Sequence, residues 1–224
     1  MAELKLKDEV AIVTGGANGI GKAISELFAQ EGADVVIADI NYKKAVKVSQ
    51  NIIARGGKSR GWKIDVGSKS DVDKMANNVV KRYGKIDILV NNAMKQDFFP
   101  FLEFPLSNFN AVLRTNLIGP FYCTQRVAKE MIKNQPYQNV RGCIINLSSP
   151  HAYLPMENGV AYSVSKFGIE GLTRNSGQEL AKYQIKVNSI VPGATWSAST
   201  TQMFTPPVQK SLKAHITLSR IVNP

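Results

Sequence analysis

The stretch Val10-Ala11-Ile12-Val13-Thr14-Gly15-Gly16-Ala17-Asn18-Gly19-Ile20-Gly21 decides the fold of this chain. Its β-branched first half predicts a buried strand, and its glycines predict a tight turn that leads directly into a helix. Such a turn lets backbone N–H groups approach a pyrophosphate, and the amino end of the helix adds positive partial charge. Ordinary loop chemistry also uses glycines, but the position between strand and helix favours a dinucleotide site at Gly15, Asn18, Gly19, Ile20 and Gly21.

An acidic residue at the end of the second predicted strand supports this interpretation. Asp39 lies 18 residues after Gly21, where a carboxylate accepts hydrogen bonds from the adenosine ribose hydroxyls. A carboxylate there repels a 2′-phosphate, and neither Ile40 nor Asn41 is basic. The sequence therefore predicts NAD rather than NADP as the cofactor. A strand-end carboxylate that faces water is the alternative.

The rest of the chain alternates strand and helix patterns. Apolar or β-branched runs predict strands at residues 34–39, 86–91, 143–147 and 185–190, with a weaker candidate at 58–64. Two apolar stripes at helical spacing lie between them, formed by Ile20, Ala23, Ile24, Leu27 and Phe28 and by Val72, Met75, Ala76, Val79, Val80 and Tyr83. This order predicts an α/β protein with a three-layer doubly wound parallel sheet of six strands, a Rossmann fold. Since no linker divides the chain, we expect residues 1–224 to form a single domain.

A tyrosine and a lysine indicate acid–base chemistry. Tyr162 and Lys166 are four residues apart in a helical segment, so their side chains share one face. An ammonium nearby stabilises phenolate over phenol, and we therefore expect Lys166 to lower the pKa of Tyr162. A tyrosine tuned in this way exchanges a proton with an alcohol or carbonyl oxygen. The pair alone is a weak signal because its spacing is common.

Two polar residues strengthen that signal. Ser149 follows a predicted strand and lies 13 residues before Tyr162, where its hydroxyl can bind a reacting oxygen. Asn116 lies early in a long helical pattern, where it can hold a water that links Lys166 to solvent. A solvent-facing helix residue is the alternative for Asn116.

Taken together, these residues resemble the short-chain dehydrogenase/reductase family of the compact single-domain type. The matching motifs cover nearly the whole chain: Thr14-Gly15-x3-Gly19-x-Gly21, Asp39, Asp65-Val66, Asn91-Asn92-Ala93, Asn116, Ser149, Tyr162-x3-Lys166 and Pro192-Gly193. The resemblance implies NAD(H)-dependent hydride transfer between nicotinamide and a secondary alcohol or ketone. It assigns Tyr162 as general acid/base, Ser149 as partner of the substrate oxygen, Lys166 as ribose binder and Asn116 as proton relay.

The resemblance also implies further cofactor contacts and an assembly. Asp65 and Val66 are expected near the adenine, Asn92 and Ala93 along the cofactor, and Pro192, Gly193 and Thr195 near the nicotinamide. A homodimer or homotetramer is implied through two long helices near residues 115–133 and 162–183.

The sequence departs from the family pattern in two places. Met94 stands where the family motif has a glycine, which puts cofactor affinity in doubt. The chain ends at Pro224, in a segment similar to the one that leads to a further helix and a seventh strand. We therefore expect either a truncated chain or an unusually short member of the family, with the sixth strand at a sheet edge and with reduced stability. A catalytically impaired cofactor-binding scaffold is the alternative function.

Substrate contacts are expected from three segments: the residues after Ser149, the aromatic loop at residues 95–105, and residues 195–215. Met94, His151 and Tyr153 are the candidate substrate residues. His151 and Tyr153 suit a polyol or sugar, whereas Phe98, Phe99, Phe101 and Phe104 suit an apolar wall or a packed lid. The substrate is therefore open among sugars, polyols, oxoacyl compounds and similar ketones.

Composition excludes several classes. The 28 Lys and Arg against 17 Asp and Glu give a net charge of +11, but these cations are spread through loops and helix faces without interleaved aromatic residues. We therefore expect no nucleic-acid partner. No apolar run has the length of a membrane helix and the first residues lack a signal-peptide core, so a cytoplasmic protein without membrane contact is expected. Two separate cysteines predict reduced thiols, and no metal site is expected.

Overall fold

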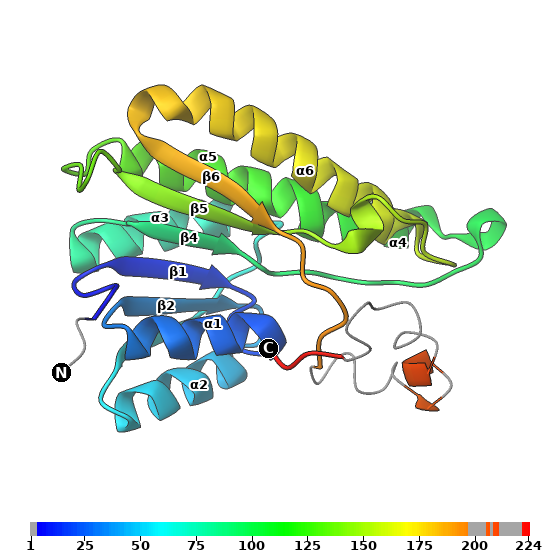
Figure 1. The fold of residues 1–224 in the computed structure, drawn as a ribbon, viewed down its shortest axis with the longest axis horizontal. Helices are drawn as coiled ribbons and strands as arrows, with labels where there is room; N and C mark the ends of the chain where they lie inside the picture. Colours follow the sequence, from blue (N-terminus) through cyan, green and yellow to red (C-terminus); the bar gives the residue numbers. More distant parts are fainter. Residues whose placement is uncertain (1–3, 197–204, 207, 211–220) are drawn as a thin grey trace.

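The computed structural model describes residues 4–196, 205–206, 208–210 and 221–224. A parallel sheet in the order β3-β2-β1-β4-β5-β6 forms the centre of the molecule (Figure 1). The six strands are β1 Val10–Thr14, β2 Asp34–Asp39, β3 Lys58–Lys63, β4 Ile88–Asn91, β5 Gly142–Leu147 and β6 Ile185–Ile190. The predicted doubly wound parallel sheet is confirmed. β4 begins two residues later than expected, since the Asp87 carboxylate accepts a hydrogen bond from the Val10 N–H at 2.8 Å.

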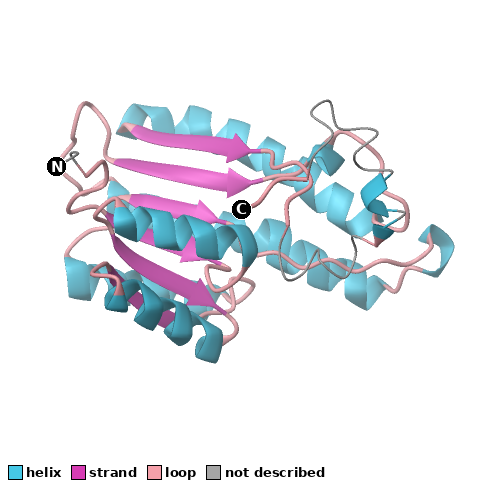
Figure 2. Cartoon of the chain, turned by 60° about the horizontal axis from the view of Figure 1, so that its bottom comes forward, coloured by secondary structure: helices cyan, strands magenta, loops and turns pink. Residues whose placement is uncertain are grey.

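Helices cover both faces of this sheet (Figure 2). α1 and α2 pack on one face, and α3, α5 and α6 pack on the other. The helices are α1 Gly19–Gln30, α2 Tyr42–Ala54, α3 Lys69–Tyr83, α4 Leu106–Leu113, α5 Gly119–Met131 and α6 Val160–Leu180. A π-helical turn, Arg114–Ile118, joins α4 to α5, and short 3-10 helices occupy Phe101–Glu103, Pro150–Ala152 and Ala181–Tyr183.

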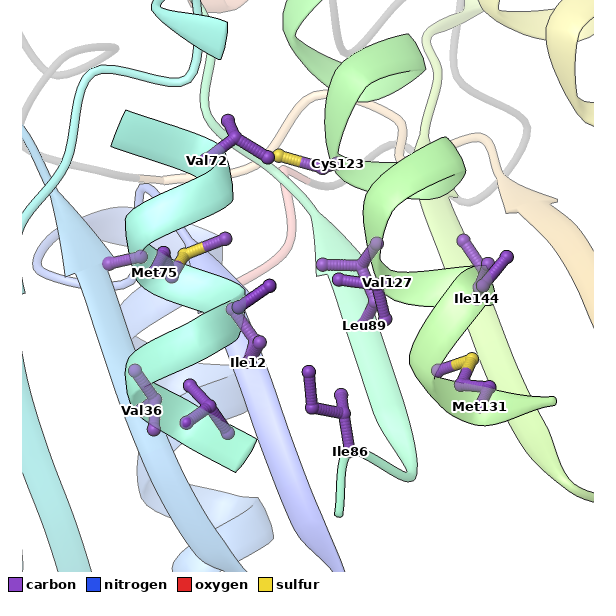
Figure 3. Packing of buried hydrophobic residues seen from close by; sticks show 14 of the residues in the cluster. Ile12, Val36, Val72, Met75, Ile86, Leu89, Cys123, Val127, Met131 and Ile144 are labelled. Atoms are coloured by element: carbon purple, nitrogen blue, oxygen red, sulfur yellow. The ribbon is translucent and has the colours of Figure 1, made fainter. Parts of the chain in front are cut away.

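The core consists of two apolar layers, one on each face of the sheet, and each central strand contributes side chains to both. On β1, Ile12 points toward α3 and α5, whereas Ala11 and Val13 point toward α1 and α2. Met75 of α3 and Val127 of α5 meet Ile12 in the first layer (Figure 3). Burial of each such side chain stabilises the fold by about 1.5–3 kcal/mol, and it fixes α3 and α5 beneath the strands.

The buried face of α1 agrees with the predicted stripe in part. Ile20, Ile24 and Phe28 pack against the core, whereas Leu27 is 54% exposed. The fully buried residues are Gly21, Ser25 and Ala29. Small residues let α1 lie close to the glycine turn, where the Ser25 hydroxyl donates to the Gly21 carbonyl at 2.9 Å. The helix therefore begins directly against the sheet, and its amino end is fixed in position.

All six strands run in the same direction, so their carboxyl ends meet at one edge of the sheet (Figure 2). The strand order reverses between β1 and β4, which are neighbours in the sheet although far apart in sequence. In open α/β sheets such a reversal leaves a crevice outside the strand ends, where ligands bind. The predicted site residues lie around this edge.

Among the described residues, no helix is long and apolar enough to cross a membrane.

Candidate active site

The turn after β1 requires glycine for two separate reasons. Gly15 and Gly19 have positive φ angles of 61° and 50°, which favour glycine. At Gly21 an added Cβ would lie 2.3 Å from Asn92 Nδ2 and 2.4 Å from the Gly15 carbonyl oxygen. The neighbouring atoms leave no room for a side chain at Gly21, so backbone atoms form the surface of the turn at this position.

The amino end of α1 suits an anionic ligand. Asn18 has an extended backbone at the cap position, but its side chain makes no capping hydrogen bond. The first N–H groups of a helix lack acceptors within the helix, so those from Gly19 to Gly21 can donate to phosphate oxygens. The cradle formed by the bare glycine backbone fits the pyrophosphate of a dinucleotide.

Asp39 at the end of β2 supports the turn directly. One carboxylate oxygen accepts a hydrogen bond from the Ala17 N–H at 3.1 Å, and the other accepts from the Asn41 N–H at 2.8 Å. The carboxylate therefore holds the glycine turn and remains at the ribose end of the crevice. Each oxygen keeps a second lone pair that can accept a hydroxyl.

The residues after β4 form the opposite wall of the turn. Asn92 Nδ2 donates to the carbonyl oxygens of Thr14 and Gly15 at 3.0 and 3.1 Å. The Thr14 hydroxyl in turn accepts the backbone N–H groups of Asn92 and Ala93. These bonds join β1 to β4 across the point where the strand order reverses.

Asp65 and Val66 lie after β3, at the far end of the crevice. The Asp65 carboxylate binds Arg114 Nη2 at 2.6 Å, and it also accepts the Gly67 N–H at 2.9 Å. Val66 is buried, and an added Cβ at Gly119 would contact it at 2.8 Å. Asp65 therefore already has a cationic partner from the turn between α4 and α5.

Tyr162 and Ser149 come together at the carboxyl end of β5. Tyr162 lies in the first turn of α6 and is 6% exposed, and the side chains of Ser149 and Gln96 lie close to its hydroxyl. Ser149 Oγ accepts the His151 backbone N–H at 3.2 Å. Because that contact uses an acceptor position, the Ser149 hydroxyl hydrogen is left to donate.

Lys166 lies one helical turn further along α6 and is 4% exposed. Its Nζ donates to the Leu147 carbonyl oxygen at 2.6 Å and lies 5.6 Å from the centre of the Tyr162 ring. Burial lowers the pKa of Lys166 to about 8. The carbonyl at the end of β5 therefore fixes this ammonium beside Tyr162.

The expected effect of Lys166 on Tyr162 is wrong in this structure. Burial raises the pKa of Tyr162 above its usual value, and the hydrogen bonds from Ser149 and Gln96 only partly offset this. The Lys166 ammonium binds the Leu147 carbonyl rather than the phenol. Tyr162 is therefore a protonated phenol at neutral pH.

Asn116 lies in the π-helical turn, and its side chain is buried. Its Oδ1 accepts the Lys95 N–H at 2.7 Å, and its Nδ2 donates to the Lys95 carbonyl at 2.9 Å and to Ser165 Oγ at 3.1 Å. Asn116 thus ties the segment after β4 to α6. Its amide is used for this connection.

The candidate substrate residues lie on two loops near Tyr162. Met94 is 41% and Tyr153 is 56% exposed, and the His151 ring meets the Tyr162 ring edge-on at 6.5 Å. The aromatic loop is partly packed on itself, since Phe104 contacts Phe99 and Phe109 at 5.3 and 6.2 Å between ring centres.

The segment after β6 passes along the crevice. Pro192 and Gly193 follow the strand, and Thr195 is 8% exposed with its hydroxyl donating to the Gly193 carbonyl at 3.0 Å. Thr195 pairs with Val222, which brings the last residues beside this segment. Of the expected substrate region 195–215, only residues 195, 196, 205, 206 and 208–210 are described.

Sequence reasoning missed several contacts that build the site. Gln96, the Leu147 carbonyl and Arg114 were not predicted, although Gln96 lies in the loop expected to contact substrate. A buried chain of hydrogen bonds also runs from Asn91 to Asn146 at 2.8 Å and from Asn146 to Thr173 at 2.9 Å. Polar residues within apolar strands were the available signal for that chain. In the described part of the protein, no three His, Cys, Asp or Glu side chains gather as a metal site would require.

Comparison with known proteins agrees with this geometry. A family model described as short chain dehydrogenase matches residues 9–207. An uncharacterized oxidoreductase of Thermotoga maritima is 39% identical over 188 residues, which cover 84% of this chain and 72% of the relative. The 7alpha-hydroxysteroid dehydrogenase of Escherichia coli is 34% identical over 221 residues, which cover 99% of this chain and 84% of that enzyme.

Solved structures give the same result. A 7 alpha-hydroxysteroid dehydrogenase complexed with NADH and 7-oxo glycochenodeoxycholic acid matches with a TM-score of 0.92 and 33% identity, covering 99% of this chain and 85% of that one. NAD+-bound xylitol dehydrogenase matches with a TM-score of 0.88 and 28% identity, covering 98% and 88%. The chain thus belongs to the short-chain dehydrogenase family of oxidoreductases.

Proposed function

We propose that this protein is an NAD(H)-dependent oxidoreductase that transfers a hydride between nicotinamide and a secondary alcohol or ketone. The observation that carries the proposal is the meeting of Tyr162, Ser149 and Lys166 at the end of β5, beside a turn shaped for a pyrophosphate. Each of these side chains is buried, so its position is fixed by the fold.

Tyr162 acts as the general acid/base. Because burial raises the pKa of Tyr162, the phenol is protonated at neutral pH and can donate to a carbonyl oxygen during ketone reduction. Ser149 donates a second hydrogen bond to the same oxygen and stabilises the negative charge that develops there. In alcohol oxidation both residues act in reverse, and Tyr162 takes the proton.

Lys166 and Asn116 support this pair. The Lys166 ammonium lies beside the Tyr162 ring, where it can bind the ribose hydroxyls at the nicotinamide end and supply positive charge. Asn116 keeps the segment at Lys95 close to α6, and we assign it the relay of protons between Lys166 and solvent. With this support, Tyr162 and Ser149 stay in fixed positions as the two hydrogen-bond donors to the reacting oxygen.

The glycine turn and its neighbours would hold the cofactor, which when bound supplies or accepts the hydride. Gly15, Asn18, Gly19, Ile20 and Gly21 face the pyrophosphate, and the further contacts are Asp65, Val66, Asn92, Ala93, Pro192, Gly193 and Thr195. Asp39 favours NAD, because its carboxylate accepts ribose hydroxyls and repels a 2′-phosphate.

We also propose that residues 1–224 act as one cofactor-binding domain that assembles into a homodimer or homotetramer through α5 and α6. Phe121 on α5 and Val164 and Phe167 on α6 are 42%, 45% and 65% exposed, which supports an interface there. Met94, His151 and Tyr153 are the proposed substrate contacts.

A panel of ketones and secondary alcohols, assayed with NAD(H) and NADP(H) in parallel, tests the function. We expect turnover with NAD(H), and we expect Tyr162→Phe to abolish it while NADH binding, followed by fluorescence, stays within about threefold. Binding without turnover in the unsubstituted protein would favour the scaffold alternative. Equal turnover by Tyr162→Phe would disprove the acid/base role.

A further inference from the structure

The edge of the molecule formed by α2 and β3 carries most of the net positive charge of the chain. Residues 40–64 hold seven of the 28 Lys and Arg and none of the 17 Asp and Glu, so they account for +7 of the net charge of +11. β3 is the first strand of the sheet, and α2 packs beside it at the end of the molecule farthest from α6 (Figure 1). All seven cations are exposed, and we call them the basic edge: Lys43, Lys44, Lys47, Arg55, Lys58, Arg60 and Lys63.

Little of this charge is neutralised within the protein. Arg55 lies 4.0 Å from Glu26, and Lys58 lies 3.5 Å from Asp34. Among the residues that the structure describes, the other five cations of the basic edge take part in no ion pair. The neighbouring surface helix α3 instead carries both signs and holds an internal ion pair at 2.8 Å. A face of a single sign creates an attractive field for anions, which a mixed face does not.

A cavity opens beside the carboxyl end of β3, within this charged surface. Its volume is about 250 Å³, and a cavity of about 150 Å³ is already large enough for a benzene ring. Tyr42 and Met75 line the cavity together with Trp62, whose side chain also packs against the core. The cavity therefore offers apolar contacts to one aromatic or aliphatic side chain.

Positive charge surrounds this cavity. Lys63 and Lys74 line it, and Arg60 lies on the face of β3 that carries Trp62. Asp71 also lines the cavity, but one oxygen of its carboxylate accepts a backbone N–H at 3.2 Å. The charge at the cavity is therefore positive on balance, and we expect a ligand that fills it to carry negative charge around its apolar group.

The spread of the charge indicates the kind of anion. α2 alone has 13 residues and is about 20 Å long, which is far more than a small ion can contact. A single-stranded nucleic acid stacks on a series of aromatic platforms, whereas the two aromatic residues of this segment, Tyr42 and Trp62, both lie at one cavity. An acidic peptide segment matches both features, because its carboxylates can face the cations while one apolar side chain fills the cavity.

We propose that the basic edge and its cavity form a docking surface for an acidic segment of a partner protein, anchored by one aromatic or aliphatic side chain. The surface lies at the opposite end of the sheet from β6, so a docked segment leaves α6 free. The proposal is independent of the proposed function, since it involves none of the residues assigned to the reaction.

Fluorescence anisotropy with labelled probes tests this proposal. The first probe is a short peptide with a central phenylalanine between glutamates. The second has alanine in place of the phenylalanine, and the third is a single-stranded oligonucleotide of equal charge. At low ionic strength we expect the phenylalanine peptide to bind about tenfold more tightly than either of the other two, and we expect its affinity to fall as salt is added.

Two variants separate the charge from the cavity, and a third is the matched control. Lys63→Glu should weaken binding of the phenylalanine peptide about tenfold. Asn78→Trp places a large side chain at an exposed position that lines the cavity, and it should reduce the affinity to that of the alanine peptide. Lys186→Glu changes an exposed lysine on β6, the opposite edge strand, and should keep the affinity within about twofold. Circular dichroism checks that each variant is folded.

Four results would overturn the proposal. Equal binding of the two peptides would show that the cavity is not an anchor. Equal or tighter binding of the oligonucleotide would assign the basic edge to nucleic acid. An equal loss in Lys63→Glu and Lys186→Glu would show that only the net charge matters. The absence of binding to every probe at low ionic strength would show that the basic edge is a solvated surface.

Discussion

The glycine turn and the catalytic corner lie at the same edge of the sheet but are built from different parts of the chain. The turn is formed by backbone atoms: a Cβ at Gly21 would collide with the Gly15 carbonyl, and the Asp39 carboxylate accepts the Ala17 N–H. The corner is formed by side chains, where Tyr162 meets Ser149 from a segment 13 residues earlier in sequence. The turn therefore depends on the absence of side chains, whereas the corner depends on the functional groups of its side chains.

This difference predicts how each region fails. A substitution in the turn changes the volume that a ligand and its neighbours can occupy, so it should act on cofactor affinity and on stability. A substitution of Tyr162 or Ser149 in the corner removes a proton or a hydrogen bond at the reacting oxygen, so it should act on turnover with cofactor affinity unchanged. Variants that change both properties together would contradict the separation.

The largest effect is expected from the corner. In Ser149→Ala the reacting oxygen loses one of its two proposed donors, while the fold loses the contact of Ser149 Oγ to the His151 N–H. We expect kcat to fall about 10²- to 10³-fold, measured by NADH absorbance with any accepted ketone. NADH affinity should stay within about threefold by fluorescence titration. Ser163→Ala, a serine of α6 on which the proposed reaction does not depend, is the control and should keep most of the activity.

The second prediction concerns the turn. Gly21→Ala places a methyl group 2.3 Å from Asn92 Nδ2, so the turn must open. We expect NADH affinity to fall about 100-fold and the free energy of unfolding to fall by about 2–4 kcal/mol. Fluorescence titration and denaturant unfolding measure the two changes.

A glycine in open space provides the matched control. Gly171 lies within α6, and an added Cβ meets nothing within 4 Å. Gly171→Ala should stabilise the protein by about 0.5–1 kcal/mol, because alanine is the better helix former, and should leave NADH affinity unchanged. If Gly21→Ala behaved like Gly171→Ala, the turn would not depend on the absence of a side chain.

The two regions also differ in how far the sequence predicts them. The strand, the glycines and Asp39 were predictable because their contacts depend on local backbone geometry and on the fixed spacing of a strand–helix–strand unit. Tyr162 and Lys166 were found from helical spacing, and Ser149 from its place after a strand. All three were then found together in the structure.

Contacts made through the tertiary fold could not be predicted in this way. Lys166 was expected to lower the pKa of Tyr162, but its nearest acceptor is the Leu147 carbonyl, and a carbonyl has no sequence signature. Asn116 fixes the backbone of Lys95 across 21 residues of sequence, and a contact of this kind leaves no local pattern. The stripe on α1 was predicted only in part for a related reason: Ile24 and Phe28 pack against the core, but the fully buried positions against the turn are small residues.

The third prediction separates the two roles of Asp39. Asp39→Asn keeps an oxygen that can accept one backbone N–H group, but it removes the negative charge at the ribose end. We expect the ratio of kcat/KM for NAD to that for NADP to fall about tenfold, because a 2′-phosphate is no longer repelled. Asp73→Asn, on the surface of α3, is the control for charge alone and should leave the ratio unchanged. An unchanged ratio in Asp39→Asn would show that Asp39 serves only the turn.

The smallest effect concerns Lys166 and the stability of the corner. Burial lowers the pKa of Lys166 from 10.5 to about 8, so between these values the unfolded chain binds a proton that the folded chain does not. Stability therefore rises with pH in this window. The free-energy cost of burying the Lys166 ammonium is fully present below about pH 8, and it falls as the pH rises from there toward 10.5. We expect the free energy of unfolding to rise by about 1 kcal/mol more between pH 7 and 9 for the unsubstituted protein than for Lys166→Met. Denaturant unfolding of both proteins at several pH values measures the difference. If the free energies of unfolding of the two proteins changed with pH in parallel, the hydrogen bond to the Leu147 carbonyl would already compensate for the burial of the ammonium. The corner would then, like the turn, be stabilised by backbone atoms.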